Sequence, residues 1–390
     1  TAAQQQPTRT QAARVRRWRI NNNLPGDPAF CPLVRRTEAV QAALRFDLAA
    51  ELSALNQSLG ADILLRTASW LTFKESRASF LIEQEADKTY RIQRFAHVIA
   101  KHCGLIDQPL SNDSLHTLQA GILGHDALGL GLRRSPVFVG QATMRENIVH
   151  YIAPPFEAVP QLLSGLQAFE QATRGAEPLA RAAALAFAFV YIHPMRDGNG
   201  RIHRFLISDS LIRDQALPVG VILPISASIM SSLDLRGRYE RTLEVFSRPF
   251  MQRYAASYRF GELVSYEDGA HSNLVFDAYT DALPAWRYPD LTEHVLYTAE
   301  VVAHTVRTEM ADEARLLIVF HRAQERLKAV WEMPDQDANR IIRSLKENGW
   351  HISGKLQKAY PQLEDRELGA KITQAVRSAF EDPDMETAAE

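Results

Sequence analysis

The sequence has few cysteines, no excess of charge of either sign and no long apolar run, and each absence excludes a class of protein. The two cysteines, Cys31 and Cys103, cannot build a disulfide framework and lack the spacing of a metal site, which favours a reducing compartment. The 44 Lys and Arg residues against 46 Asp and Glu leave a net charge of -2. The chain as a whole therefore has no field that would attract nucleic acid or a membrane.

The longest apolar run, AAALAFAFVYI (182–192), is shorter than the roughly 20 residues that a membrane-spanning helix needs. It predicts a buried core helix instead. The N-terminus shows no charged start followed by an apolar stretch, and so no signal peptide. We therefore expect a cytoplasmic protein without membrane contact.

The length of 390 residues allows a sizeable core and more than one domain. Residues 1–36 are rich in Gln, Arg and Pro and predict a loosely docked arm, with a phosphate-binding or partner-binding arm as the alternative. Apolar residues then recur at helical intervals after Thr37, a candidate helix cap. These intervals predict an N-terminal helical region over 37–105, with separate helices over 37–59, 61–70, 75–85 and 89–101.

The rest of the chain is also expected to be mostly helical, so the predicted fold class is mainly α. A central core over 106–225 should hold helices over 156–174, 179–192 and 198–215. A helical C-terminal region over 226–390 follows, with its best linker candidate at 265–273. The stretch DQDANRIIRSLKENGWHI (335–352) resembles half of a helix-turn-helix, so a winged-helix unit within 315–390 is one interpretation.

The segment over 133–155 differs from its helical surroundings. Two short runs that favour β-structure, 136–139 and 149–152, are separated by a polar stretch, and two prolines end the second run. This pattern predicts an isolated β-hairpin. The arginines before it, Arg133 and Arg134, are expected to be solvated rather than catalytic.

The stretch IHPMRDGNGRIHRF (192–205) concentrates turn residues and charge between two apolar helices. Gly198 and Gly200 permit backbone conformations that turn consecutive N–H groups inward, at a helix N-terminus whose dipole favours an anion. Arg201 and Arg204 are three residues apart and share one helical face. Two guanidinium groups above a glycine-rich anion cradle predict a polyphosphate site.

Two further groups in this stretch supply chemistry. Asp197 is the carboxylate that could hold a divalent cation against the phosphates, and His193 is the group that could take a proton near neutral pH. Together these residues indicate transfer of a phosphate-linked group from a nucleotide. The alternative, a helix–loop–helix with glycine for turning and arginine for solvation, explains neither the arginine spacing nor the histidine.

The sequence HPMRDGNGRIHR (193–204) closely resembles the signature HxFx(D/E)GNGRxxR of the Fic family, with Met195 where the family usually has Phe. The resemblance extends more weakly over about 61–224 and implies a helical core with a small β-hairpin flap. It implies these roles: His193 as the base that deprotonates a target hydroxyl, Asp197 as the ligand of Mg²⁺ (or Mn²⁺), Gly198, Asn199 and Gly200 as the nucleotide-phosphate turn, and Arg201 and Arg204 on the β- and γ-phosphates.

Two other parts of the chain are similar to features of that family. The hairpin is similar to the flap that lays a target peptide beside the loop as an added strand, which would involve Val137, Phe138 and Val139. Upstream, Ser79 to Glu83 in SRASFLIEQE is similar to the inhibitory motif (S/T)xxxE(G/N), with Gln84 at the last position. Glu83 would then pair with Arg204 and occupy the space of the γ-phosphate. The alternative is that Glu83 is one of many acidic residues on a helix surface.

These features predict a protein adenylyltransferase that moves AMP from ATP to a Ser, Thr or Tyr hydroxyl of a target protein and is autoinhibited by Glu83. De-adenylylation and transfer of another phosphate-linked group are related alternatives. From another class comes a nucleotide-sensing regulator that binds DNA or a partner protein through its C-terminal region. The expected partners are ATP, a target protein and a second copy of the chain in a homodimer.

Overall fold

The computed structural model describes residues 13–60, 63–85, 88–125, 127, 129–142 and 147–381, and parts of the predicted arm, flap and C-terminal region lie outside these ranges. The chain divides into two compact units. The first comprises the described residues within Thr1–Leu52 and Ala68–Glu309, and the second those within Ser53–Thr67 and Met310–Glu390. Among the described residues, no helix combines the length and the apolar character that crossing a membrane requires.

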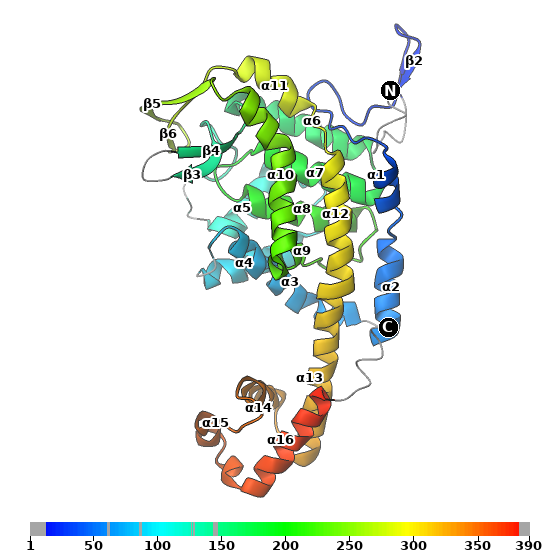
Figure 1. Cartoon of the computed structure of the whole chain (residues 1–390), viewed down its shortest axis with the longest axis vertical. Coiled ribbons are helices and arrows are strands. Elements are labelled where there is room, and N and C mark those ends of the chain that lie inside the picture. The colour runs from blue at the N-terminus through cyan, green and yellow to red at the C-terminus, as the bar shows by residue number, and fades with distance from the viewer. Residues whose placement is uncertain are drawn as a thin grey trace. The chain divides into compact units, whose positions relative to one another are not determined.

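The first unit is mainly helical, in agreement with the predicted fold class (Figure 1). Its helices are α1 (Glu38–Ala43), α4 (Thr89–His102), α5 (Asn112–Leu123), α6 (Val159–Ala172), α7 (Pro178–Ile192), α8 (Asn199–Arg213), α9 (Ile225–Ser231), α10 (Leu233–Arg253), α11 (Tyr279–Arg287) and α12 (Thr292–His304). A short 3-10 helix, Phe156–Ala158, precedes α6, and a π-helix, Thr305–Met310, follows α12. Two further helices, α2 (Leu48–Leu59) and α3 (Ile63–Ile82), each contribute residues to both units.

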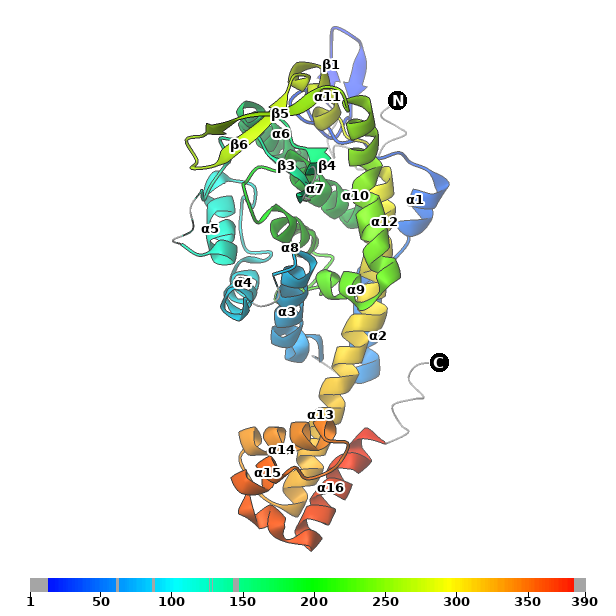
Figure 2. The same cartoon turned by 60° about the vertical axis from the view of Figure 1, so that its left-hand side comes forward.

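Helix α7 is the predicted core helix and is buried along almost all of its length. It begins with Pro178 at the first helical position, a common start signal, and the Glu177 side chain caps it by accepting a hydrogen bond from the Ala180 N–H. Its many alanines carry no bulk beyond Cβ, so neighbouring helices can approach closely. Helices α6, α8 and α12 pack against it (Figure 2). Helix α8 is also buried, which places the residues of the quoted motif inside the unit.

Helix α3 corrects one prediction. The separate helices expected over 61–70 and 75–85 are one continuous helix, Ile63–Ile82, because no Gly or Pro interrupts these twenty residues. The predicted cap at Thr37 is present, since its side chain accepts a hydrogen bond from the Val40 N–H. The single helix expected over 37–59 was wrong, however, because α1 ends at Ala43 and α2 begins only at Leu48.

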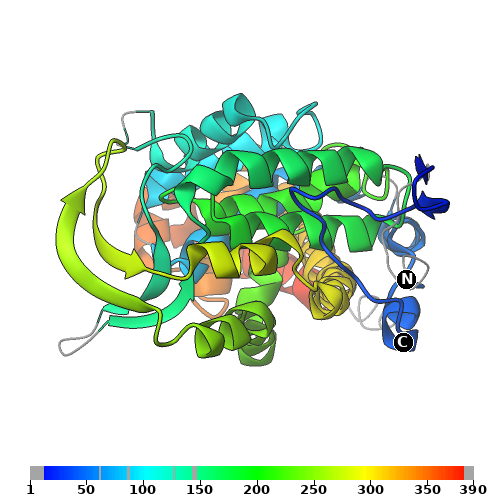
Figure 3. The ribbon, with the colours of Figure 1, turned by 90° about the horizontal axis from the view of Figure 1, so that it is seen from above.

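Three antiparallel hairpins accompany the helices: β1 (Ala13–Val15) with β2 (Ile20–Asn22), β3 (Phe138–Ala142) with β4 (Asn147–Ile152), and β5 (Tyr258–Ser265) with β6 (His271–Phe276). The β3–β4 pair confirms the predicted hairpin and carries a bulge between Val139 and Gly140. The long, curved β5–β6 hairpin is clear in Figure 3. The linker predicted at 265–273 was wrong, because these residues pair in β5 and β6 around a tight turn.

The N-terminal arm is held more firmly than expected over residues 30–34. Phe30 and Val34 are buried, and the main chain of Cys31 and Leu33 bonds to the last residue of α11 and to the segment after it. The expectation of a loosely docked arm was therefore wrong for these residues.

The second unit contains α13 (Ala311–Val330), α14 (Asp335–Glu347), α15 (Gly354–Ala359), a 3-10 turn (Pro361–Glu364) and α16 (Arg366–Phe380). Helix α14 buries Ala338, Ile341, Ile342 and Leu345 at helical spacing against α13 and α16. The described residues from 310 to 381 contain no strand, so the wing of the predicted winged-helix unit is absent from them. A groove of about 610 Å³ between α14 and α15 is lined by Arg340, Arg343 and Lys355 among other polar residues.

Candidate active site

Two residues of the loop between α7 and α8 have a left-handed backbone conformation. His193 caps α7 with a φ of 49°, in the left-handed region, and its N–H donates to the Phe189 carbonyl at 3.0 Å. Gly198 precedes α8 with a φ of 93°. A side chain at Gly198 would be strained in this conformation, which explains the glycine there. The first amides of α8 face the loop without helical carbonyl partners, as at any helix N-terminus.

Asn199 and Met195 fix the shape of this loop. The Asn199 side-chain oxygen accepts from the Met195 N–H at 3.1 Å, and its amide nitrogen donates to the Met195 carbonyl at 2.7 Å. Both side chains are buried. Because its side chain is committed to the loop, Asn199 can reach a nucleotide only through its backbone. The Met195 side chain is fully buried and anchors the loop in the core.

Arg133 holds the same loop from outside the motif. Its guanidinium donates to the His193 carbonyl at 2.7 Å, to the Ser135 carbonyl at 3.0 Å and to the Pro154 carbonyl at 2.6 Å. Its side chain is buried, so the expectation of a solvated Arg133 was wrong, whereas Arg134 is exposed as expected. Three carbonyl acceptors replace the water that a buried guanidinium loses.

The His193 ring is set up to accept a proton. Its Nδ1 lies 3.2 Å from the Val190 carbonyl, which can only accept, so the neutral ring donates from Nδ1 and leaves Nε2 without a proton. Loss of water around the ring, together with the positive charge of Arg133, lowers the pKa of His193 to about 4. The ring is therefore neutral at pH 7.

Arg204 is enclosed by the end of helix α3. It donates to the Ser79 hydroxyl at 2.9 Å, to the Ser79 carbonyl at 3.1 Å and to a Glu83 carboxylate oxygen at 2.9 Å. A longer bond of 3.4 Å reaches the Tyr239 hydroxyl. The Arg204 side chain is only 1% exposed, so these groups replace its water almost completely. The predicted pairing of Glu83 with Arg204 is thus present.

Glu83 is charged in this position. Burial opposes its charged form, but the Arg204 guanidinium outweighs burial and holds the pKa of Glu83 below its usual value. The carboxylate also lies against the loop itself, because a Cβ added at Gly200 would come within 2.4 Å of a Glu83 oxygen. Gly200 therefore gives Glu83 the room to reach Arg204.

Arg201, the other predicted phosphate ligand, is also occupied. It donates to Glu85 at 2.6 Å and to Asp197 at 3.0 Å, and its guanidinium lies 4.7 Å from the centre of the Phe80 ring. Between Glu83 and Glu85, Gln84 has a φ of 59°, a conformation that glycine and asparagine adopt more readily. This turn lets Glu83 and Glu85, which are two residues apart, pair with Arg204 and Arg201 respectively.

Residues 109–211 match the model of the Fic/DOC family. The chain contains a Fic domain. The matched residues include the whole loop and β3–β4, whereas the end of α3 and the β5–β6 hairpin lie outside them.

Two curated relatives are both described as protein adenylyltransferase fic-1. The protein of Caenorhabditis briggsae is 28% identical over 176 residues, and that of Caenorhabditis elegans is 27% identical over 176 residues. Each match covers 42% of this chain and 31% of the relative, so the chain spans about a third of the length of these relatives. The crystal structure of a Fic family protein from Desulfovibrio desulfuricans G20 aligns with a TM-score of 0.44 and 18% identity, over 85% of this chain and 87% of that one.

The fold brings most of the predicted site residues together. His193, Asp197, the Gly-Asn-Gly turn, Arg201, Arg204, Ser79 and Glu83 lie on one loop and the two helix ends beside it. The flap residues lie apart on the hairpin, with Val139 exposed and β4 as the only strand paired with β3 among the described residues. His203 is buried against Phe187, with ring centres 4.6 Å apart, which supports a packing role.

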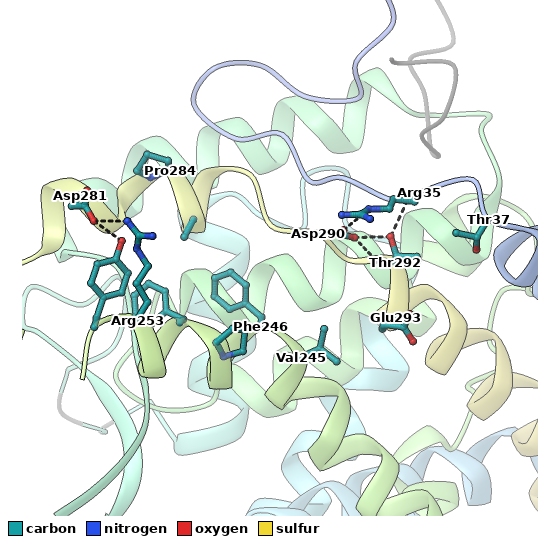
Figure 4. Close-up of a pocket in the computed structure, with 14 residues that line it drawn as sticks. Arg35, Thr37, Val245, Phe246, Arg253, Asp281, Pro284, Asp290, Thr292 and Glu293 are labelled. Atoms are coloured by element: carbon teal, nitrogen blue, oxygen red, sulfur yellow. Dashed lines mark hydrogen bonds and ion pairs between the residues drawn. The ribbon is translucent and has the colours of Figure 1, made fainter. Parts of the chain in front are cut away.

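Sequence reasoning missed Arg133 and Glu85. Glu85 could have been predicted, since this residue directly follows the stretch that resembles the inhibitory motif. Arg133 has no local signal that distinguishes it from its exposed neighbour. A large cavity of about 780 Å³ was also unexpected. It lies between α10, α11, the start of α12 and the arm, where Arg35 pairs with Asp290 and Arg253 with Asp281 (Figure 4), and none of the loop residues lines it.

Proposed function

We propose that this Fic domain transfers AMP from ATP to a hydroxyl group of a protein. The observation that supports this most is the combination of a neutral His193 with two arginines at the N-terminus of α8. In this reaction the hydroxyl oxygen attacks the α-phosphorus and the bond to the bridging oxygen of pyrophosphate breaks. The hydroxyl proton passes to Nε2 of His193.

Arg201, Arg204 and the first amides of α8 would hold the pyrophosphate as its negative charge grows. Arg133 contributes indirectly, since it fixes the His193 carbonyl and with it the left-handed backbone that presents the ring. Met195 and Asn199 keep the loop in one shape, which limits the cost of positioning the reacting groups.

Asp197 fits the role of a magnesium ligand. Its side chain is half exposed, and the hydrogen bonds to it from Gly198 and Arg201 both go to one oxygen. The described residues contain no group of three or more His, Cys, Asp or Glu side chains that could hold a metal ion. A single carboxylate with phosphate oxygens and water completing the shell is a common arrangement for Mg²⁺, and Mn²⁺ accepts similar ligands. When bound, the cation would neutralise phosphate charge.

Glu83 would act as an internal inhibitor of this reaction. Its carboxylate occupies the guanidinium that ATP would need, so productive ATP binding requires Glu83 to leave Arg204. The edge of β3 that pairs with no other described strand, together with the residue before it (Val137 to Val139), would receive the target chain through backbone hydrogen bonds. Backbone pairing carries little side-chain preference and leaves the target open.

One experiment tests the transfer reaction. The chain and its Glu83→Gly variant are incubated with Mg²⁺ and with ATP labelled at either the α- or the γ-phosphate. We expect protein-bound label from the α-phosphate alone, more in Glu83→Gly, and none in Glu83→Gly/His193→Ala. Label from the γ-phosphate would instead indicate phosphorylation, and α-label that survives His193→Ala would contradict the assigned base.

The charged Glu83 beside the loop supports a second candidate, removal of AMP from a modified protein. A carboxylate that stays ionised could orient the attacking water. For this activity Glu83→Gly should abolish the release of AMP from an adenylylated protein, whereas the transfer reaction should increase in the same variant. The opposite signs separate the two candidates. A nucleotide sensor would bind ATP but show neither reaction.

A further inference from the structure

The turn between β5 and β6 carries an aspartate, Asp268, that bonds both within its own hairpin and outside it. Within the turn, Asp268 accepts from the Ala270 N–H at 3.1 Å, and Gly269 takes a φ of 73°. The turn closes with a bond of 2.9 Å from the Tyr266 N–H to the Ala270 carbonyl. These local bonds use only one of the two carboxylate oxygens of Asp268.

The second carboxylate oxygen binds the segment that begins the flap. It accepts from the Arg134 N–H at 2.8 Å and from the hydroxyl of the buried Ser135 at 2.7 Å. Burial opposes the charge on Asp268, but these hydrogen bonds outweigh it and lower its pKa. The carboxylate is therefore charged at neutral pH, and hydrogen bonds to a charged acceptor are stronger than those to a neutral one.

The main chain of Asp268 binds the catalytic loop. Its carbonyl accepts from a guanidinium nitrogen of Arg196 at 2.9 Å, and Arg196 lies between Met195 and Asp197. Arg196 passes over Gly129, where an added Cβ would come within 2.6 Å of its guanidinium. One residue of the β5–β6 turn thus contacts both the start of the flap and the loop.

The strands of the two hairpins are also in contact. The Phe138 ring of β3 and the Phe260 ring of β5 meet edge to face, with centres 5.4 Å apart. This contact and the Asp268 bonds connect the second hairpin to the flap at two points. Glu267, the neighbour of Asp268, differs, because it forms only a surface ion pair of 2.6 Å with Arg134 in which both side chains are mostly exposed. Such pairs contribute little.

We propose that Asp268 is a positioning residue for the transfer reaction, which holds the flap at a fixed place relative to the catalytic loop. A target hydroxyl enters on the flap, whereas the base stands on the loop, so the distance between them depends on whatever joins the two. Arg133, which precedes the flap in the sequence, bonds to both the flap and the loop. Asp268, which follows the loop in the sequence, also bonds to both. This inference rests on the proposed AMP transfer.

The test uses the full chain carrying Glu83→Gly, with self-modification by α-labelled ATP as the readout. Asp268→Ala should lower the rate constant of labelling at saturating ATP, here called kcat, by about tenfold, since misplaced reacting groups react more slowly. The KM for ATP should stay within about twofold of its value in the parent. Asp268→Asn, which keeps one acceptor oxygen, should lie between. Glu267→Ala is the matched control from the same turn and should change neither constant by more than about twofold.

An unchanged kcat in Asp268→Ala would overturn the inference. A tenfold loss of kcat accompanied by weaker ATP binding and a lower melting temperature would also overturn it, because that combination indicates a damaged fold rather than lost positioning.

Hydrogen exchange makes the inference independent of activity. If Glu83→Gly incorporates no α-label at all, the proposed function fails, but Asp268 can still be tested. Asp268→Ala should then speed amide exchange at 134–142 and 193–199 and leave α6 unchanged, whereas Glu267→Ala should leave all three alone. Unchanged exchange at the flap and the loop would overturn the inference.

Discussion

Two segments far apart in the sequence reach the same loop, and they use carboxylates in opposite ways. The end of α3 presents Glu83 and Glu85 to the side chains of Arg204 and Arg201, which a nucleotide would also need. The β5–β6 turn presents Asp268 to a backbone N–H and a hydroxyl, neither of which is among the proposed nucleotide ligands. A carboxylate of the first kind competes with a ligand, whereas one of the second kind only fixes geometry. Removing the first should raise activity and removing the second should lower it.

Among the variants that test this difference, Glu83→Gly should change label incorporation most. It removes a partly buried, charge-assisted bond of about 1.5–3 kcal/mol from Arg204. Since about 1.4 kcal/mol corresponds to tenfold, incorporation of α-label at subsaturating ATP should rise about ten- to a hundredfold.

Glu347→Gly is the matched control for that variant, because Glu347 is likewise an acidic residue at a helix end but is exposed and belongs to the second unit. It should leave incorporation unchanged. A Glu83→Gly chain no more active than the parent, with its melting temperature intact, would remove the competing role of this carboxylate.

A smaller rise in incorporation of α-label at subsaturating ATP is expected from Glu85→Gln. Arg201 would keep Asp197 and the Phe80 ring as partners, so the gain should be about two- to fivefold. The measurement is the KM for ATP, which should fall. Glu240→Gln, an exposed acid that pairs only along its own helix, supplies the control. A rise in KM would mean that Glu85 supports the site instead of competing for it.

The effect of Gln84→Gly should be smaller still and of opposite sign. Glycine adopts the φ of 59° at this position without strain, so the turn that places both carboxylates becomes more stable by about 1 kcal/mol. Unfolding by denaturant should show that gain, and label incorporation should fall by a few fold. A less stable variant would show that the Gln84 side chain makes a contact worth more than the strain.

The smallest effect concerns pH. The pKa of His193 is lowered to about 4, so the ring is neutral, and able to act as a base, at any pH well above that value. Incorporation by Glu83→Gly should therefore change less than about twofold between pH 8 and pH 6, and fall only on further acidification. A midpoint near 6.5, the value of an ordinary histidine, would show that the ring is more hydrated than its surroundings imply.

The parts of the site that the sequence predicted are those that local spacing decides. His193, Asp197, Arg201 and Arg204 fall within one stretch of twelve residues, and a short motif places Glu83. Their catalytic and inhibitory roles stay predictions until the variants are measured. The helical class and the β3–β4 hairpin also followed from periodicity and turn residues.

The parts that the sequence did not predict depend on contacts between distant residues. Arg133 looks like its exposed neighbour Arg134 and is distinguished only by carbonyls about 20 and 60 positions away. The polar, turn-rich stretch before β6 is typical of linkers and of hairpin turns alike, and only strand pairing decides between them. A composition rich in Gln and Arg likewise hid the few apolar residues that dock the arm.

The nearly complete enclosure of Arg204 has a consequence for how ATP concentration is sensed. A nucleotide that bound here would displace an internal ligand, so its apparent affinity would equal its intrinsic affinity multiplied by the fraction of chains in which Glu83 has already left Arg204. If that fraction were about one in a hundred, apparent binding would be about a hundredfold weaker. A protein that drew the end of α3 away would restore the lost affinity, and by thermodynamic reciprocity ATP would tighten the binding of that protein by the same factor.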